Sequence, residues 1–467
     1  MHPPRTLPST VALVTLVSLL LAGFDAHADA DASKISLAVR RTQLANGLVV
    51  LLHEDHHTPI VAVNLWYHVG SKDEPAGRYG FAHLFEHLMF QGSKHVPEDM
   101  YFRYLERAGA SNINGTTGSD RTNYFETVSR NRLELALWLE SDRMGFLLDH
   151  VDEKTFASQR EVVKNERRQN YENAPYGLVQ KYVDEAMFPE SHPYHHLTIG
   201  SPEDLDASTL ADVKQFFRTW YVPNNATLAI AGDIDEREAT ALVEKYFGPV
   251  AAGPAPPILP AAPPPVLAGE TRLDIESSAE LARVQIEWPT PKFFAPGDSD
   301  LDLLARVLTA TKNSRLFKRL VYVDQIAQDV SAAQASRQLV SQFEIVATAK
   351  PGHTPEELLA AIDQELANVV QNGIAEAELS RARTAFVAGK AFGLEGVGAR
   401  ADALNEFVHY TGDPEYLPKD VARYDNASAS SLRRVALEWL TPSKRVVAFV
   451  RPNKEAPLAG RLVRKVP

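Results

Sequence analysis

Two short segments near the start of the chain have the residue pattern of β-strands. Leu48 to Leu52 follows the pair Asn46-Gly47, and Ile60 to Tyr67 is rich in β-branched and aromatic residues. Asn-Gly pairs favour tight turns, and β-branched and aromatic side chains favour strands. We therefore expect both segments to be strands of an antiparallel sheet.

Longer segments that follow have helical spacing of their apolar residues, as in Asn131 to Leu148 and Thr155 to Tyr171. Strands and helices come in blocks rather than in strict alternation along the chain. That order is typical of an α+β fold, with a mixed, mainly antiparallel sheet packed against helices.

A proline-rich segment divides the chain. Gly253 to Pro265 contains seven prolines among small apolar residues, and such a segment favours extended, semi-rigid conformations. We expect a linker over residues 251–267, between one domain at 35–250 and another at 268–467.

The two domains end in similar sequences. Trp220 and Pro223 precede a strand-like segment that begins at Leu228, and the second domain repeats this order at positions 439, 442 and 447. The same offset along the chain relates all three pairs of positions. The constant offset indicates two homologous halves; a chance similarity between a helix end and a strand is the alternative.

Composition and charge narrow the class of protein. The chain has 467 residues, of which 45% are hydrophobic and 23% charged, as in ordinary globular proteins. Its net charge is −12, and it has no basic run with interleaved aromatic residues. A role in nucleic-acid binding is therefore disfavoured.

The segment 1–28 resembles a secretory signal peptide. Arg5 precedes an apolar stretch from Val11 to Gly23, and Ala26-His27-Ala28 is a small-x-small cleavage site. The stretch is short for a membrane span, although an uncleaved anchor is the alternative. The chain has no cysteine, which excludes disulfides and thiolate ligands and suits an exported protein of the bacterial periplasm.

The segment Gly80 to Phe90 contains the most informative motif, an H-x-x-E-H sequence formed by His83, Glu86 and His87. The two histidines are four residues apart, so on a helix both imidazoles point to one side and can bind one ion. Glu86 is placed to reach a water on that ion, as in the inverted motif of zinc peptidases. Leaving such polar groups unpaired in an apolar helix would cost about 1–3 kcal/mol each. A buried helix with satisfied histidines and a salt-bridged glutamate is the alternative.

A catalytic zinc site needs a third protein ligand. Glu166 is the candidate, because we expect it to lie on the apolar side of a helix with Val162 and Val163. Spacing alone leaves Glu161 and Glu172 as alternatives. The basic residues of this helix can face solvent; they are Arg160, Lys164 and Arg167.

The remaining histidine clusters are weaker candidates for metal binding. Neighbouring histidines point in different directions and do not easily converge on one ion. These clusters contain His56, His57, His192, His195 and His196.

Gly70 to Glu74, Gly80 to Ser93 and Val162 to Arg168 resemble the pitrilysin, insulysin and mitochondrial processing peptidase family of inverted zincins. The resemblance covers nearly the whole chain after the signal peptide. It implies two α+β halves of like fold, with zinc bound by the first half only. It also implies that Glu166 is the third ligand.

Asn112 to Thr117, followed by Thr122 to Val128, resembles the family's substrate-binding edge strand, and Asn114 matches its active-site asparagine. Alternating Thr, Tyr and Val residues suit an exposed strand that pairs with a peptide. An ordinary hairpin with a turn at Asn114-Gly115 is the alternative.

The sequence departs from the family pattern in two places. Gln159 stands where the family commonly has a second glutamate, which puts any electrostatic role of that position in doubt. Arg315 and Tyr322 have the spacing of the family's substrate-gripping Arg and Tyr, but alignment places that pair at Val321 and Gln328. We therefore interpret Arg315 and Tyr322 as a coincidence and expect the true pair to be missing.

These features predict a periplasmic zinc endopeptidase that hydrolyses peptides or unfolded polypeptides. Glu86 would act as general base on a zinc-bound water. Family members surround the site with four halves, so we expect a dimer, specifically a heterodimer whose homologous partner supplies the Arg and Tyr. The alternatives are a non-catalytic structural subunit and a peptide- or metal-binding module without turnover.

Overall fold

The computed structural model describes residues 35–257, 262 and 264–466. The expected signal peptide and part of the expected linker lie outside the described residues. The first half forms a six-stranded sheet in the order β1-β2-β6-β3-β5-β4. Its strands are β1 (Arg40–Gln43), β2 (Val49–Glu54), β3 (Ile60–Tyr67), β4 (Ser111–Thr117), β5 (Thr122–Ser129) and β6 (Ala226–Gly232).

The second half forms a six-stranded sheet in the order β12-β7-β11-β8-β10-β9. Its strands are β7 (Thr271–Ser277), β8 (Arg283–Thr290), β9 (Ala327–Ala335), β10 (Ser341–Ala349), β11 (Val446–Pro452) and β12 (Arg461–Val466).

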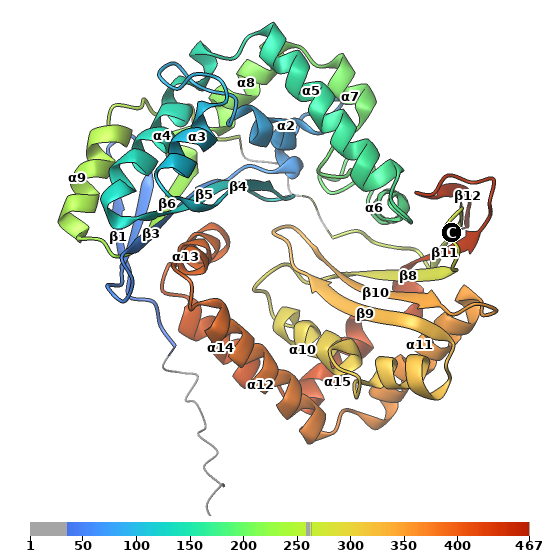
Figure 1. The fold of residues 1–467 in the computed structure, drawn as a ribbon. Coiled ribbons are helices and arrows are strands. Elements are labelled where there is room, and N and C mark those ends of the chain that lie inside the picture. Colours follow the sequence, from blue (N-terminus) through green and yellow to red (C-terminus); the bar gives the residue numbers. More distant parts are fainter. Residues whose placement is uncertain (1–34, 258–261, 263, 467) are drawn as a thin grey trace, which may run out of the picture.

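Helices cover both sheets (Figure 1). Those of the first half are α2 (Phe81–Leu88), α3 (Met100–Arg107), α4 (Leu133–Phe146), α5 (Glu153–Arg167), α6 (Val179–Met187), α7 (Pro202–Ala207), α8 (Leu210–Trp220) and α9 (Glu236–Phe247). Those of the second half are α10 (Asp298–Thr309), α11 (Pro355–Asn372), α12 (Glu376–Gly393), α13 (Val397–Thr411), α14 (Leu417–Asp425) and α15 (Ala429–Trp439). No helix in the described ranges has the length and apolar character needed to cross a membrane.

Five strands of each sheet follow the same order, β2-β6-β3-β5-β4 and β7-β11-β8-β10-β9, which confirms the predicted pair of α+β halves. In each, the strand after the Trp–Pro pair is internal: β6 pairs parallel with β2 and antiparallel with β3. Likewise β11 pairs parallel with β7 and antiparallel with β8. Both sheets are therefore mixed. They are mainly antiparallel, as predicted, and β6 lies between β2 and β3.

Each half sends one helix across to the other half's sheet (Figure 1). From the second half, α13 buries Ala401, Leu404 and Phe407 in a cluster with Leu51 and Ala229 of the first sheet. In the opposite direction, α6 buries two valines in a cluster with side chains of β7 and β11. The halves thus share apolar cores, and this packing fixes their relative placement.

Candidate metal centre

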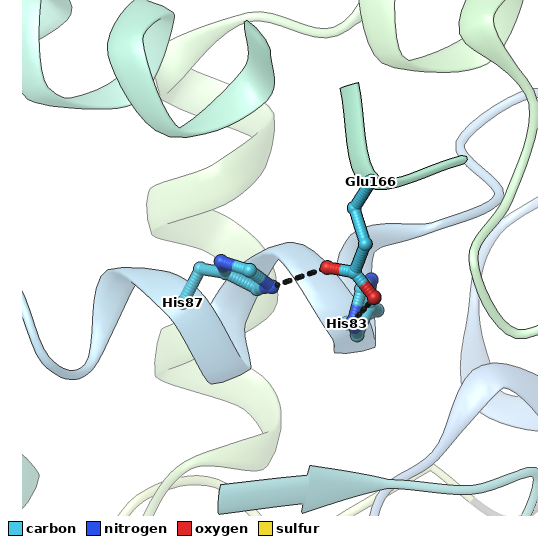
Figure 2. Close-up of side chains that lie close together, drawn as sticks. All are labelled: His83, His87 and Glu166. Atoms are coloured by element: carbon cyan, nitrogen blue, oxygen red, sulfur yellow. Dashed lines mark ion pairs between the residues drawn. The ribbon is translucent and has the colours of Figure 1, made fainter. Parts of the chain in front are cut away.

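The helix α2 presents both histidines of the motif on one side, and Glu166 approaches them from α5 (Figure 2). Nε2 of His87 lies 3.2 Å from Oε2 of Glu166, and Nε2 of His83 lies 3.7 Å from Oε1. One ligand atom from each residue lies within 4.8 Å of the other two. Within the described part of the chain, this is the one group of three or more such residues that could hold a metal ion.

The chemistry of these three side chains suits zinc. Burial lowers the pKa of His83 to about 4, with a smaller effect of His87, and burial also lowers the pKa of His87. Both imidazoles are therefore neutral near pH 7, which is the form that binds a metal. Two neutral nitrogens and one carboxylate also match a known ligand set of catalytic zinc.

Glu74 holds the start of α2 in place. Its buried carboxylate accepts hydrogen bonds from the backbone N–H groups of Gly80 and Ala82, each at 2.8 Å. These groups would otherwise lack partners at the helix N-terminus. Burial nevertheless raises the pKa of Glu74 well above its ordinary value. The contact spans six to eight residues and follows no local capping rule, so no sequence pattern assigns a role to Glu74.

Glu86 lies beside the three converging groups without joining them. Burial raises the pKa of its carboxyl group, and a hydrogen bond from Thr117 opposes that shift. Oγ1 of Thr117 donates to Oε2 of Glu86 at 2.6 Å. A carboxylate with a raised pKa is a better proton acceptor at neutral pH than an exposed one, as general-base catalysis requires.

The helix α5 is oriented differently from the expectation based on its sequence. Val163 is buried, but Val162 is 42% exposed, while Arg167 is only 6% exposed. Arg167 points inward and donates to Oε1 of Glu172 at 3.2 Å and to the carbonyl of Gly200. The expected orientation of α5 is therefore wrong at Val162 and Arg167 and holds at Val163.

The two glutamates that were alternatives to Glu166 as third ligand form ion pairs with basic residues of α5. Glu161 pairs with Lys164 at 3.0 Å, and Glu172 pairs with Arg167. Gln159 is buried two turns before Glu166. Beyond α5 the chain forms a π-helical turn, Arg168–Glu172, and such turns are frequent at functional sites.

Asn114 lies on β4, the edge strand of the first sheet, and is exposed. It pairs with Phe125 of β5, so the Asn114-Gly115 pair is inside the strand and the alternative of a turn there is wrong. The turn lies instead between β4 and β5, at residues 118–121. Gly115 and Thr117 face Glu86, so Asn114 points to the opposite face of the sheet.

Arg315 and Tyr322 have different surroundings. Arg315 donates to both carboxylate oxygens of Glu378, at 2.9 and 2.7 Å, and to the carbonyl of Gly373. Tyr322 is 48% exposed on a π-helical segment, Phe317–Val323. Arg315 is thus engaged within its own half.

Comparison with known proteins identifies the family. Residues 49–198 match the family described as "Insulinase (Peptidase family M16)", and residues 207–386 match "Peptidase M16 inactive domain" of the same family. The chain is 28% identical over 453 residues to "Zinc protease PqqE" of Helicobacter pylori, covering 95% of this chain and 97% of that protein.

Two solved structures show the same fold. The crystal structure of a protease from Helicobacter pylori superposes with a TM-score of 0.84 at 27% identity, covering 89% of this chain and all (100%) of that one. The periplasmic protease PqqL from Escherichia coli superposes with a TM-score of 0.74 at 19% identity, covering 90% of this chain and 48% of that one. The chain belongs to the M16 family of metallopeptidases, the family of insulinase.

Proposed function

We propose that this chain is a zinc endopeptidase that uses His83, His87 and Glu166 as metal ligands and Glu86 as general base. The observation that carries the proposal is the convergence of the three ligand atoms from α2 and α5, with the Glu86 carboxylate beside them. A zinc ion bound there would lower the pKa of a water molecule and polarise the scissile carbonyl.

The protein's own residues account for the remaining steps. Glu86 takes the proton from the attacking water and passes it to the leaving amine nitrogen. The free edge of β4 offers backbone N–H and C=O groups to an extended peptide. Asn114 on that strand is proposed to contact the substrate. Main-chain pairing gives affinity with little sequence preference, which suits peptides or unfolded polypeptides as substrates.

Metal removal tests this function. The purified protein, dialysed against a chelator, should lose hydrolysis of a quenched fluorescent peptide and regain it when about one equivalent of zinc per chain is added. Hydrolysis that survives complete removal of zinc would contradict the proposal.

We further propose that the active form is a heterodimer in the periplasm. The chain spans about half the length of the periplasmic protease PqqL, which it covers over 48%. Arg315 is occupied by Glu378 rather than free to bind a substrate. A homologous partner would supply the missing Arg and Tyr. The N-terminal segment 1–28, proposed as a signal peptide, would direct export.

Peptide hydrolysis by the lone chain and by the chain mixed with a homologous partner tests the heterodimer. We expect activity to rise when the partner is added and Tyr322→Phe to have no effect on the mixture. Full activity of the lone chain would contradict the heterodimer. Loss of activity in Tyr322→Phe would show that Tyr322 contacts the substrate.

A further inference from the structure

The edge strand β4 touches the general base directly. Oγ1 of Thr117 donates a hydrogen bond to Oε2 of Glu86, at 2.6 Å. Two residues earlier on the same strand, a Cβ atom built on Gly115 would lie 3.0 Å from Cγ of Glu86. Glu86 is thus pressed against β4 at one position and hydrogen-bonded to it at the other.

This contact restricts the orientation of the Glu86 carboxylate. A glutamate side chain has several rotatable bonds, and α2 fixes only its Cα atom. The Thr117 hydroxyl binds one carboxylate oxygen. Within the described part of the chain, no other side chain donates to this carboxylate, so Oε1 is available to accept a proton.

The geometry points to Thr117 as a positioning residue that holds Glu86 in the orientation needed for proton transfer, with Gly115 leaving room for it. The inference rests on the proposed function, because it requires Glu86 to be the general base. Since the proton is taken at Oε1, the hydrogen bond at Oε2 can persist while Glu86 accepts and then releases it. Thr117 itself neither gains nor loses a proton.

The position of Thr117 predicts which kinetic constant depends on it. Its side chain points toward Glu86, whereas a peptide would pair with the backbone at the free edge of β4. Removing the hydroxyl should therefore affect kcat more than KM. A misplaced catalytic group can lower the rate about 100-fold.

The kinetic constants of Thr117→Val, Thr117→Ser and wild type, compared for peptide hydrolysis, test the inference. The chain is measured alone if it is active alone, and otherwise together with its partner. We expect Thr117→Val to lower kcat about 10- to 100-fold, with KM and zinc content close to wild type. Thr117→Ser keeps the hydroxyl and should restore most of kcat. Thr127→Val is the matched control, because Thr127 lies on β5 with its hydroxyl near Gly398 of α13, away from Glu86; it should keep wild-type kcat.

A double variant separates positioning from general destabilisation. Glu86→Asp shortens the side chain by one methylene, so its carboxylate should no longer reach Thr117. In that background, Thr117→Val should cause no further loss of kcat. An unchanged kcat in Thr117→Val, or an equal loss in both backgrounds, would overturn the inference while leaving the proposed function intact. A wild-type chain that binds zinc but shows no hydrolysis, alone or with its partner, would overturn both.

Discussion

Of the three proposed metal ligands, Glu166 is the one that comes from α5, whereas both histidines lie on α2. Its two oxygens face Nε2 of His83 and Nε2 of His87. The other glutamates near it are paired with Lys164 or Arg167. In the part of the chain that the structure describes, Glu166 forms no ion pair with a lysine or arginine, so its charge is suited to a bound cation.

Zinc affinity of three single variants tests the choice of ligand. Glu166→Gln should weaken zinc binding at least about 100-fold, since removing even an outer partner of a ligand costs about 10- to 100-fold. Glu161→Gln and Glu172→Gln should bind zinc like the wild type, as measured by competition with a chelating dye. An equal loss of affinity in either control would show that Glu166 is not the third ligand.

At the scale of single helices and strands, the residue pattern predicts those features that depend only on residues close together in the chain. The pattern of Ile60–Tyr67 predicts the bounds of β3, because β-branched residues next to a turn have few other stable arrangements. The histidine spacing likewise predicts that one side of α2 carries both imidazoles. Contacts between elements are not predictable, since Glu74 and Thr117 reach α2 through tertiary folding. The Asn114-Gly115 pair shows the reverse case, in which sheet pairing overrides a strong turn preference.

The start of α2 provides a prediction at this scale. Glu74→Gln can accept only through one atom, so one of the N–H groups of Gly80 and Ala82 would lose its partner. We expect zinc affinity to fall about 10- to 100-fold, because the helix carrying both histidines is held less firmly.

Asp235→Ala is the control for Glu74→Gln, because it removes a side-chain acceptor at another helix start. Asp235 also accepts from two backbone N–H groups at a helix start, but the helix is α9, which carries no part of the metal site. Zinc affinity should be unchanged in this variant. Wild-type affinity in Glu74→Gln would contradict the role assigned to Glu74.

At the scale of the whole molecule, polar groups as well as apolar cores join the two halves. Asp184 of α6 lies beside Glu287 of β8, and the amide of Gln342 donates to both carboxylates, at 3.1 and 2.5 Å. Where α13 crosses to the first sheet, Asp402 of α13 accepts hydrogen bonds from the side chains of two residues of β3, at 3.0 and 3.1 Å. No sequence pattern indicates these contacts, because they join residues far apart in the chain.

The contact between Asp184 of α6 and Glu287 of β8 predicts that the free energy of unfolding depends on pH. Burial raises the pKa of Glu287 well above its ordinary value of 4.5, the charges of Glu344 and Asp184 raise it further, and Gln285 and Arg337 oppose the shift. In the folded state this carboxyl group stays protonated at pH values at which the unfolded chain is ionised. Its contribution to stability is therefore complete below pH 4.5 and is lost as the pH rises toward the folded-state pKa. The loss is at most about 1.4 kcal/mol per pH unit for one proton.

Glu287→Gln mimics the protonated form and removes this titration. We expect the stability of the variant relative to wild type to be higher at pH 8 than at pH 5, as measured by urea unfolding at both values. Glu276→Gln is a control, because Glu276 lies on the neighbouring part of the same sheet but pairs with Arg461 at the surface. A difference in stability between Glu287→Gln and wild type that is the same at pH 5 and pH 8 would contradict the assigned protonation of Glu287.

The central claim is that His83, His87 and Glu166 bind a catalytic zinc ion and that Glu86 acts as the general base beside it. Zinc content and peptide hydrolysis of Glu86→Gln, measured on the same preparation, test it most directly. We predict about one zinc per chain, as in the wild type, with hydrolysis reduced at least about 100-fold. Hydrolysis at the wild-type rate in the zinc-loaded variant would contradict the claim.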